Sequence, residues 1–349
     1  MRKYFYELMT DARHGYVDRC VKACLWGFSK IYGFISTFTR ALYQDHVLPV
    51  YRSPRPVVSV GNITTGGVGK TPLVIWLVSA LTKQGRQVAV LSRGYKGDKH
   101  AVNDETRMFK EILPDVRIAT GRDRKQSIQR VLAAQKVDVF IADDAFSHWP
   151  LHRDLDIVAI DASNPFGNGN LIPRGILREK VENLVRADVL VLTKTDKAKS
   201  TRWLCAELRS INSRALIIES RHVPSRLSNI VTGQISKLSD LNRQRVVALS
   251  AIGDPSSFEF TLGELGSEVA RHFIFADHHT YSEEEIRQVL AWAVKENINI
   301  LVTTHKDAVK IAAFKSLFQP FKVLSVEIEL EITQGQDEII KRIISLRRD

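Results

Sequence analysis

The sequence has 349 residues, of which 44% are hydrophobic and 26% are charged. This length exceeds what one compact core usually organises, so we expect two domains, and the mixed composition excludes a fibrous or disordered chain. The net charge of +11 favours an anionic partner such as a nucleotide or a phospholipid surface. No interleaved aromatic and basic motif accompanies this charge, so we expect no nucleic-acid partner. Three cysteines, Cys20, Cys24 and Cys205, provide no disulfide framework and indicate a reducing compartment.

The N-terminal segment, residues 1–48, is predicted to associate with a membrane. Residues 20–43 are rich in Leu, Ile, Phe, Trp and Tyr but carry Lys22, Lys30 and Arg40. A spanning helix needs roughly 20 mostly apolar residues without central charges. The pattern therefore favours an amphipathic helix that lies in the interface of an anionic leaflet. An ordinary helix packed on the protein core is the alternative.

Between residues 49 and 222, strand patterns alternate with helical ones. Runs such as 137–142 are almost continuously apolar, which indicates strands buried on both faces, as in a parallel sheet. The predicted strands are Val57–Val60, Gln87–Ser92, Val137–Ala142, Asp156–Ile160, Val189–Thr193 and Leu216–Glu219, with helices at Lys70–Lys83 and Lys125–Ala134. This alternation predicts an α/β nucleotide-binding domain with a doubly wound, mostly parallel sheet. Such sheets bind ligands at the carboxyl ends of their strands.

Residues 223–349 are predicted to form a linker and a second, smaller α/β domain. The stretch after His222 is polar and has no long apolar period, which is typical of a linker or a small ribbon. Beyond it, apolar runs alternate with predicted helices at Ser257–Leu265 and Glu283–Glu296.

A glycine-rich turn between a predicted strand and a predicted helix indicates a phosphate-binding loop (P-loop). Its candidate nucleotide-binding residues are Thr64, Thr65, Gly66, Gly67, Val68, Gly69, Lys70 and Thr71. The glycines allow backbone N–H groups to face anionic oxygens, and Lys70 would neutralise charge on the β- and γ-phosphates of a nucleotide. The Thr71 hydroxyl would ligate Mg²⁺. Thr64 stands where the usual pattern has its first glycine, so the formal motif fails by one residue.

Two adjacent acids, Asp143 and Asp144, follow the hydrophobic strand 137–142. Magnesium requires carboxylate ligands, and a metal-binding acid of a P-loop protein belongs at the end of such a strand. We therefore predict a metal site at Thr71, Asp143 and Asp144. A helix cap or an ion pair with an arginine is the structural alternative.

Six motifs, in this order, resemble the tetraacyldisaccharide 4′-kinase family: SVGNITTGGVGKTP, LSRGY, DDAFSHWPLHRDLDIVAID, GNGNLIPRGILRE, FADHHTYS and TTHKDAVK. The resemblance covers nearly the whole chain, and a non-glycine residue at position 64 is a feature of that family. It implies ATP-dependent phosphorylation of the 4′-hydroxyl of a tetraacyldisaccharide 1-phosphate, an acylated disaccharide phospholipid. The product would be lipid IV-A, made at the cytoplasmic face of the inner membrane. The implied fold is two α/β/α domains joined by a short β linker, and we expect a monomer.

The resemblance also implies roles for single residues. Asp104 and His278, which come from different predicted domains, would together accept the proton of the attacking hydroxyl. Arg178 would clamp phosphate oxygens. The structural alternatives are an exposed loop acid for Asp104, a helix cap for His278 and a surface ion pair for Arg178. Side chains expected to support the aspartates or to meet phosphate are His148, Arg153 and Arg93.

The chain departs from the family pattern at several positions. Ala145, Ser147, Lys180 and His305 replace Gly, Gln, Pro and Glu, and NDET at residues 103–106 replaces Gly-Asp-Glu-Pro. We expect retained activity with altered substrate contacts, because the lysine and threonine of the loop and both aspartates are present.

Two rival functions follow from the sequence. The run TKTD, Thr193 to Asp196, resembles the guanine-reading motif of P-loop GTPases, which favours a GTPase switch or metallochaperone. A membrane-associated nucleotide-binding module without transferase activity is the second rival, and in that case Asp104 and His278 would have no catalytic role.

Overall fold

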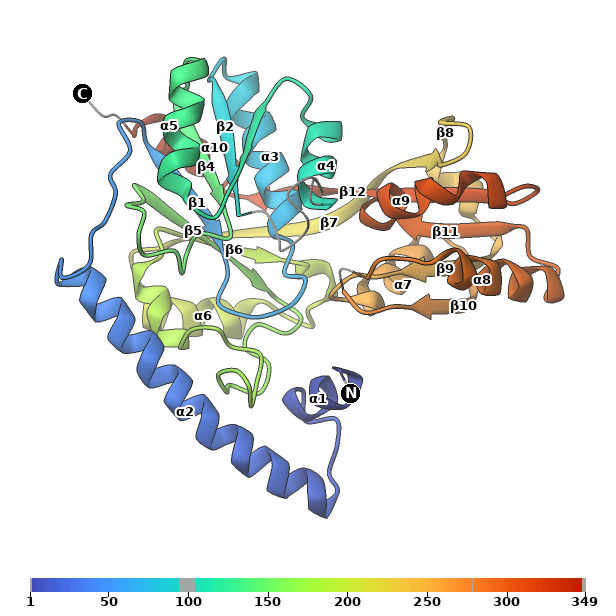
Figure 1. The fold of residues 1–349 in the computed structure, drawn as a ribbon, viewed down its shortest axis with the longest axis horizontal. Coiled ribbons are helices and arrows are strands. Elements are labelled where there is room, and N and C mark those ends of the chain that lie inside the picture. The colour runs from blue at the N-terminus through green and yellow to red at the C-terminus, as the bar shows by residue number, and fades with distance from the viewer. Residues whose placement is uncertain (1, 94–103, 278, 347–349) are drawn as a thin grey trace. The chain divides into compact units, whose positions relative to one another are not determined.

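The computed structural model describes residues 2–93, 104–277 and 279–346, and the chain divides into two compact units (Figure 1). Unit 1 comprises residues 1–94, 115–221 and 332–349, and unit 2 comprises residues 95–114 and 222–331. The chain leaves unit 1 within strand β7 (Leu216–Asn229) and returns to it within strand β12 (Lys322–Gln334). The domain boundaries inferred from the sequence divide the chain into consecutive stretches, whereas each unit of the structure combines separate stretches of the chain.

Unit 1 is built on a parallel sheet in the order β7-β6-β5-β1-β4-β2-β3. Its other strands are β1 (Val57–Gly61), β2 (Val88–Ser92), β3 (Arg117–Thr120), β4 (Val139–Asp143), β5 (Leu155–Asp161) and β6 (Val189–Thr193). Every residue of β1, β2, β4 and β6 is buried, which agrees with their near-continuous apolar sequences. The predicted α/β class with a mostly parallel sheet is confirmed.

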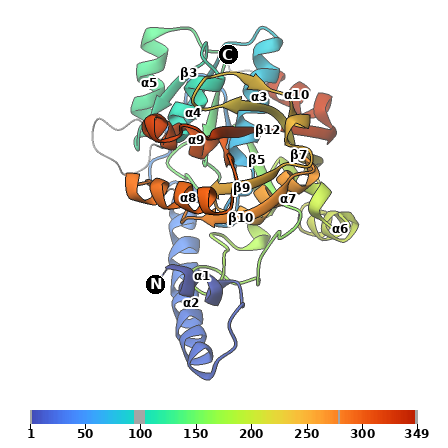
Figure 2. The same cartoon turned by 90° about the vertical axis from the view of Figure 1, so that its right-hand side faces the viewer.

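Helices cover this sheet and complete its core. They are α3 (Lys70–Lys83), α5 (Arg124–Ala134), α6 (Arg202–Ile211) and α10 (Gln336–Ile344), with short 3₁₀ turns η1 (Val181–Arg186) and η2 (Thr195–Lys197). Ile128 of α5 shares a buried cluster with Phe140, and Leu204 of α6 shares another with Val158. The C-terminal helix α10 lies beside α3, as both views show (Figures 1 and 2).

Two N-terminal helices, α1 (Arg2–Met9) and α2 (Tyr16–Gln44), also belong to unit 1. On α2, Ser29 and Gly33 are buried, whereas the side chains spaced three or four residues apart on the opposite face are exposed. We call this surface the apolar face of α2; its residues are Phe28, Ile31, Phe34, Ile35 and Phe38, each more than half exposed. The predicted amphipathic helix is therefore present. Within the described residues, no helix has the length and apolar character needed to span a membrane.

Unit 2 contains a second, smaller sheet region in the order β10-β9-β11-β12-β7, with β8 (Ile235–Ser236) antiparallel to β7. The remaining strands are β9 (Arg245–Ser250), β10 (Glu268–Ile274) and β11 (Ile300–Thr304). Its helices are α4 (Asp104–Ile112), α7 (Pro255–Glu264), α8 (Glu283–Lys295) and α9 (His305–Ile311), with 3₁₀ turns η3 (Leu238–Leu241) and η4 (Ala312–Leu317). The polar stretch after His222 forms part of a ribbon, because β7 continues through it to Asn229.

Candidate active site

The loop between β1 and α3 has the backbone of an anion-binding turn. Gly66 and Gly69 adopt positive φ angles of 108° and 83°, and Gly69 is the residue that precedes the first turn of α3. Glycine reaches this conformation without steric cost, so the loop can turn its N–H groups toward an anion at the positive end of the helix dipole. Thr65, Gly66 and Gly67 are exposed, which leaves the loop open to a ligand.

Thr64, the residue that breaks the usual motif, has a structural place. It is 5% exposed, and its hydroxyl lies 3.3 Å from the amide nitrogen of Asn62, which donates to it. Thr64 also forms an isolated antiparallel bridge with Leu177. A side chain at this position thus helps to join the loop to a neighbouring segment of unit 1.

Lys70 projects from the first turn of α3 toward two polar partners. Its ammonium group donates to the side-chain oxygen of Asn62 at 2.9 Å and lies 3.6 Å from a carboxylate oxygen of Asp144. The Lys70 side chain is 21% exposed. A cation held beside an acid at the mouth of a glycine-rich loop has the placement needed to meet nucleotide phosphates.

The two aspartates at the end of β4 have different environments. Asp143 ends the strand and is 6% exposed, whereas Asp144 has a left-handed backbone with φ of 48° and a side chain that is 38% exposed. Burial favours a raised pKa for Asp144, but hydrogen bonds from Arg178 and the charges of Arg178, Lys70 and Arg124 lower that pKa below its usual range. Asp144 is therefore an ionised carboxylate next to Lys70.

Arg178 connects this acid to the P-loop. Its guanidinium group donates to both carboxylate oxygens of Asp144, at 3.0 and 2.8 Å, and to the backbone and side-chain oxygens of Asn62. The structure thus brings together four of the predicted or adjacent site residues: Lys70, Asp144, Arg178 and Asn62. Asp143 ends the strand that Asp144 follows, and Thr71 is the second residue of α3, next to Lys70.

Three residues of this region were not singled out from the sequence. Asn62 lies in a motif whose glycines drew attention, yet it contacts Thr64, Lys70 and Arg178. Arg124 begins α5 at 3% exposure and donates to the carbonyl oxygens of Asp143 and Asp144. Burial lowers the pKa of Arg124 to about 10, and the two acids oppose that shift. No sequence pattern marks an arginine at a helix start as a partner of a distant strand end.

The third of these residues is Glu179, which is 3% exposed and accepts hydrogen bonds from three side chains. They belong to Ser147, Asn183 at 2.9 Å and Arg186 at 2.6 Å. Ser147, one of the departures from the family pattern, is thereby incorporated into a buried polar network.

The supporting residues proposed around the aspartates occupy one neighbourhood. Arg153 forms an ion pair with Asp156 at 2.8 Å and donates to the carbonyl oxygen of His148 at 2.9 Å. Burial, together with the charges of Arg124, Arg153 and Arg93, lowers the pKa of His148 to about 4. His148 is therefore neutral at pH 7.

The remaining departures are accommodated locally. Ala145 is fully buried in the cluster that contains Phe140, and Lys180 is exposed at the start of η1. In unit 2, His305 lies 3.6 Å from a carboxylate oxygen of Glu111 and 3.9 Å from one of Glu327. A basic side chain is electrostatically suited to that acidic pair.

Little of the predicted proton-accepting pair falls within the described residues. Asp104 is the first residue of α4, but its side chain and the whole of His278 lie outside the described residues. The ranges assigned to unit 2, residues 95–114 and 222–331, include both positions, and α4 packs on α9. The roles predicted for these two residues stay predictions.

The TKTD run follows strand β6 in unit 1. The Thr193 hydroxyl donates to the carbonyl oxygen of Val68 in the P-loop at 2.8 Å, and the Lys194 ammonium pairs with Asp161 at 2.5 Å. Just beyond, Thr195 and Asp196 line a pocket of about 460 Å³ together with Glu219 and Arg221.

A parallel sheet with an open glycine-rich loop after β1, and an ionised acid after the adjacent β4, defines a P-loop nucleotide-binding protein. Comparison with known proteins narrows this class. A model of the tetraacyldisaccharide-1-P 4′-kinase family matches residues 21–345. The chain therefore belongs to the tetraacyldisaccharide-1-P 4′-kinase family, and it is a kinase. This result confirms the resemblance found in the sequence and does not favour the GTPase alternative.

Individual relatives agree with this assignment. The chain is 37% identical over 315 residues to a tetraacyldisaccharide 4′-kinase of Anaeromyxobacter sp. (strain K), covering 85% of this chain and 83% of that protein. It is 31% identical to a protein of the same name from Halothermothrix orenii, with 98% of each covered. Its fold resembles that of LpxK from Aquifex aeolicus, crystallised in complex with ATP, with a TM-score of 0.72 and 28% identity over 93% of this chain and 99% of that one.

Proposed function

We propose that this chain transfers the γ-phosphate of ATP to the 4′-hydroxyl of a tetraacyldisaccharide 1-phosphate and thereby forms lipid IV-A. The observation that carries the proposal is the placement of Lys70 3.6 Å from Asp144 beside the open loop. Phosphoryl transfer needs little covalent chemistry from the protein, because positioning and neutralisation of charge supply most of the rate.

Each part of this site has a distinct task. The N–H groups of Gly66, Gly67 and Gly69 and of the start of α3 bind the β- and γ-phosphates. Lys70 neutralises charge on the transferred group, and it exchanges its contact with Asn62 for one with phosphate oxygens. Arg178 holds Asp144 in place through a bidentate ion pair and adds positive charge beside the phosphates.

The residues at the loop suit Mg²⁺. The Thr71 hydroxyl, Asp144 and Asp143 would hold the ion, with phosphate oxygens and water as its other ligands. Asp144 offers a half-exposed, ionised carboxylate for this purpose. In the described part of the chain, no group of three or more His, Cys, Asp or Glu side chains could hold a metal by itself. That fits an ion that arrives with its nucleotide. Mg²⁺ would supply positive charge to the β- and γ-phosphate oxygens.

Asp104 and His278 complete the proposal as the pair that takes the proton of the 4′-hydroxyl. Their support is the family pattern, together with the membership of both residues in unit 2. A carboxylate that orients an imidazole ring raises its basicity, which suits a proton acceptor near neutral pH.

The nucleoside of ATP has a candidate position in the pocket lined by Thr195 and Asp196. The link between this pocket and the phosphates is Thr193, which binds Val68 of the P-loop two residues before the pocket begins. Asp196 and Glu219 offer carboxylate oxygens that can accept a hydrogen bond from the exocyclic amino group of adenine.

The lipid acceptor and the apolar face of α2 together support a location at the cytoplasmic face of the inner membrane. The apolar face of α2 presents large exposed side chains, and the same helix also carries Lys22, Lys30 and Arg40. The Lys30 ammonium lies 4.7 Å from the centre of the Trp26 ring. Such a helix binds an anionic lipid surface through its apolar face and its basic residues. We expect the enzyme to act there as a monomer.

The test is a transfer assay from γ-labelled ATP to tetraacyldisaccharide 1-phosphate in mixed micelles. Wild type should place label on the lipid, and Lys70→Ala should reduce the rate on the order of 10³-fold, because phosphate charge is left unneutralised. Lys83→Ala, at the exposed end of the same helix, is the matched control and should retain full activity.

Two outcomes would contradict the proposal. A wild-type protein that only hydrolyses nucleotide, or that prefers GTP, would return the GTPase rival. Transfer that survives both Asp104→Asn and His278→Gln would leave the loop chemistry standing and remove the proton-accepting pair from it.

A further inference from the structure

A short segment of unit 1, Leu171 to Arg178, is bound on one side by the P-loop and by the residue just before it. The backbone N–H of Thr65 donates to the carbonyl oxygen of Ile176 at 2.7 Å, and the N–H of Arg178 donates to that of Ile63 at 2.6 Å. We call residues 171–178 the bridging segment. Its backbone fixes the position from which the Arg178 side chain reaches Asp144.

The polar face of α2 binds the other side of the bridging segment. The Tyr32 hydroxyl donates to the carbonyl oxygen of Arg178 at 2.9 Å. The Ser29 hydroxyl lies 2.7 Å from the carbonyl oxygen of Leu171, and it accepts the backbone N–H of Arg174 at 3.0 Å. A Cβ atom at Gly33 would approach the Leu171 side chain to 2.8 Å, so the absence of a side chain there lets the helix come this close.

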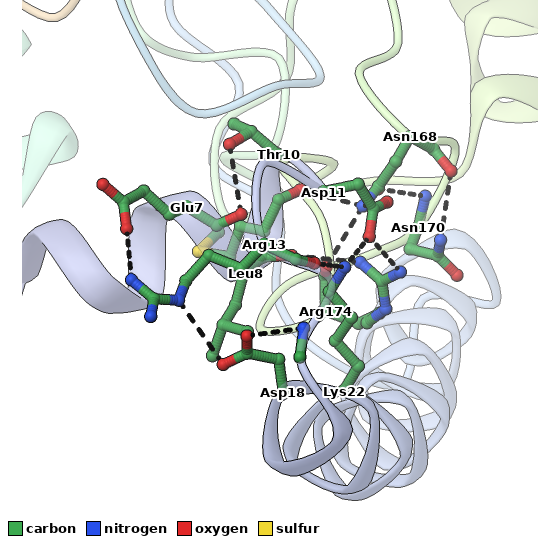
Figure 3. A network of polar contacts seen from close by, with 12 residues as sticks. Glu7, Leu8, Thr10, Asp11, Arg13, Asp18, Lys22, Asn168, Asn170 and Arg174 are labelled. Carbon is green, nitrogen blue, oxygen red and sulfur yellow. Dashed lines mark hydrogen bonds and ion pairs between the residues drawn. The ribbon is translucent and has the colours of Figure 1, made fainter.

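The turn between α1 and α2 binds Arg174 of the bridging segment and the nearby Asn168 (Figure 3). The Asp11 carboxylate accepts hydrogen bonds from Arg174 at 2.7 Å and Asn168 at 2.9 Å, and it pairs with Lys22 of α2 at 2.5 Å. Arg174 also donates to the carbonyl oxygen of Leu8 at 3.3 Å. The N-terminal helices therefore bind the segment at several points along its length.

These contacts and the apolar face are on opposite sides of one helix. Ser29, Tyr32 and Gly33 bind the bridging segment, whereas Phe28, Ile31 and Phe34 are exposed on the other side. A lipid surface that orders α2 would therefore also order the segment that carries Arg178. A nucleotide that orders the P-loop would act on the same segment through the hydrogen bonds of Ile63 and Thr65.

We propose that Ser29 and Tyr32 are positioning residues that couple binding of a lipid surface at α2 to binding of ATP at the P-loop. The inference rests on the proposed function, since it assumes a bilayer at the apolar face and ATP at the loop. Two ligands that order one shared element favour each other, and thermodynamic linkage requires the two effects to be equal.

The experiment measures this linkage in both directions with the full chain. ATP affinity is measured by calorimetry, with Mg²⁺ present, with and without vesicles of phosphatidylethanolamine and phosphatidylglycerol. Vesicle affinity is measured by flotation, with and without ATP. For wild type we expect vesicles to tighten ATP binding by about 5- to 20-fold, and ATP to tighten vesicle binding by the same factor.

Two variants and a control separate coupling from stability. Tyr32→Phe and Ser29→Ala should each reduce the linkage factor below about twofold, while ATP and vesicles are still bound separately. Tyr16→Phe removes a hydroxyl from an 83% exposed tyrosine of the same helix and should leave the linkage intact. A general loss of structure would weaken both separate affinities, which the four measurements would reveal.

The outcomes also distinguish this inference from the proposed function. A wild-type linkage factor near one, in a protein that transfers phosphate and binds vesicles, overturns the coupling and leaves the kinase function intact. A linkage that persists in both variants shows that Ser29 and Tyr32 do not carry it. Failure of the vesicles to bind would refute the membrane part of the proposed function and the coupling with it.

Discussion

Each of the two units has an aspartate close to the carboxyl end of a parallel strand, but the two aspartates have different environments. Asp144 follows β4, and its side chain is 38% exposed beside Lys70. Asp307 follows β11 and is fully buried, accepting the backbone N–H of Ala251 at 2.9 Å and the Thr304 hydroxyl at 2.7 Å. The two acids therefore share a position near a strand end but differ in exposure and in partners, because Asp144 pairs with Arg178 and Asp307 with the backbone of Ala251.

The threonines of the two units show the same contrast. Thr193, at the end of β6, donates to Val68 in the P-loop, whereas Thr303, in β11, donates to Leu249 of the neighbouring strand at 2.8 Å. The first hydroxyl supports a loop that binds a ligand, and the second supports only the sheet. The motif TTHKDAVK contains Thr303 and Asp307, which both form hydrogen bonds within unit 2.

The largest expected effect tests the chemical half of this comparison. Asp144→Asn should reduce transfer by about 10²- to 10³-fold, because the site loses the charge that pairs with Arg178 and that would bind Mg²⁺. Initial rates at saturating ATP measure this loss. Asp115→Asn, an exposed loop acid of unit 1, is the control. Near-normal rates in Asp144→Asn would show that this acid is no more functional than Asp307.

The structural half is tested by Asp307→Ala. Removal of the carboxylate leaves the buried N–H of Ala251 and the ammonium of Lys310 without this acceptor, so unfolding free energy should fall by about 3 kcal/mol. Urea unfolding measures that change. Transfer per folded molecule should stay near the wild-type value; a large loss of rate with unchanged stability would assign Asp307 to the chemistry instead.

The smallest effect compares the buried histidines of the two units. The folded-state pKa of His148 is about 4, lowered by burial and by nearby arginines. An ordinary unfolded histidine titrates near 6.5, so the unfolded chain gains the proton first as the pH falls. Stability is therefore present in full above pH 6.5 and is lost progressively toward pH 4. His148→Gln should remove about 1 kcal/mol of this acid sensitivity, after discounting for solvent screening.

His272 in unit 2 provides the comparison. Burial lowers its pKa, but the hydrogen bond and charge of Glu259 oppose that shift. We expect His272→Gln to change the acid dependence less than His148→Gln. Unfolding curves at pH 7 and pH 5 measure both variants, and an equal change in the two would remove the distinction between a histidine among arginines and one beside a carboxylate.

The features that the sequence predicted well are those that depend on a pattern of neighbouring residues. Buried strands such as 139–143 are continuous apolar runs, and the P-loop is a glycine pattern between a strand and a helix, so both are recognisable without a structure. Family motifs supplied Arg178, but not its partner. Nothing local in the sequence says that this guanidinium binds Asp144, 34 residues away, rather than solvent.

Long-range packing accounts for what the sequence did not predict. The arginine at position 124 contacts backbone carbonyls 19 and 20 residues away, a relation set by the packing of α5 and not by any motif. The grouping of residues 95–114 with unit 2 follows from the contact of α4 with α9, which sequence order conceals. Asn62 was not singled out for another reason. Its side-chain amide contacts residues that were each interpreted separately.

The return of the chain to unit 1 after unit 2 has a consequence for synthesis on the ribosome. The helix that carries Lys70 is covered by α10, and Arg342 of α10 donates to the carbonyl oxygen of Asp188 at 3.2 Å. Unit 2 is thus translated in full before the last piece of unit 1 emerges. Unit 1 therefore stays incomplete until α10 is made, and a stop codon before position 336 would remove a helix that packs on α3.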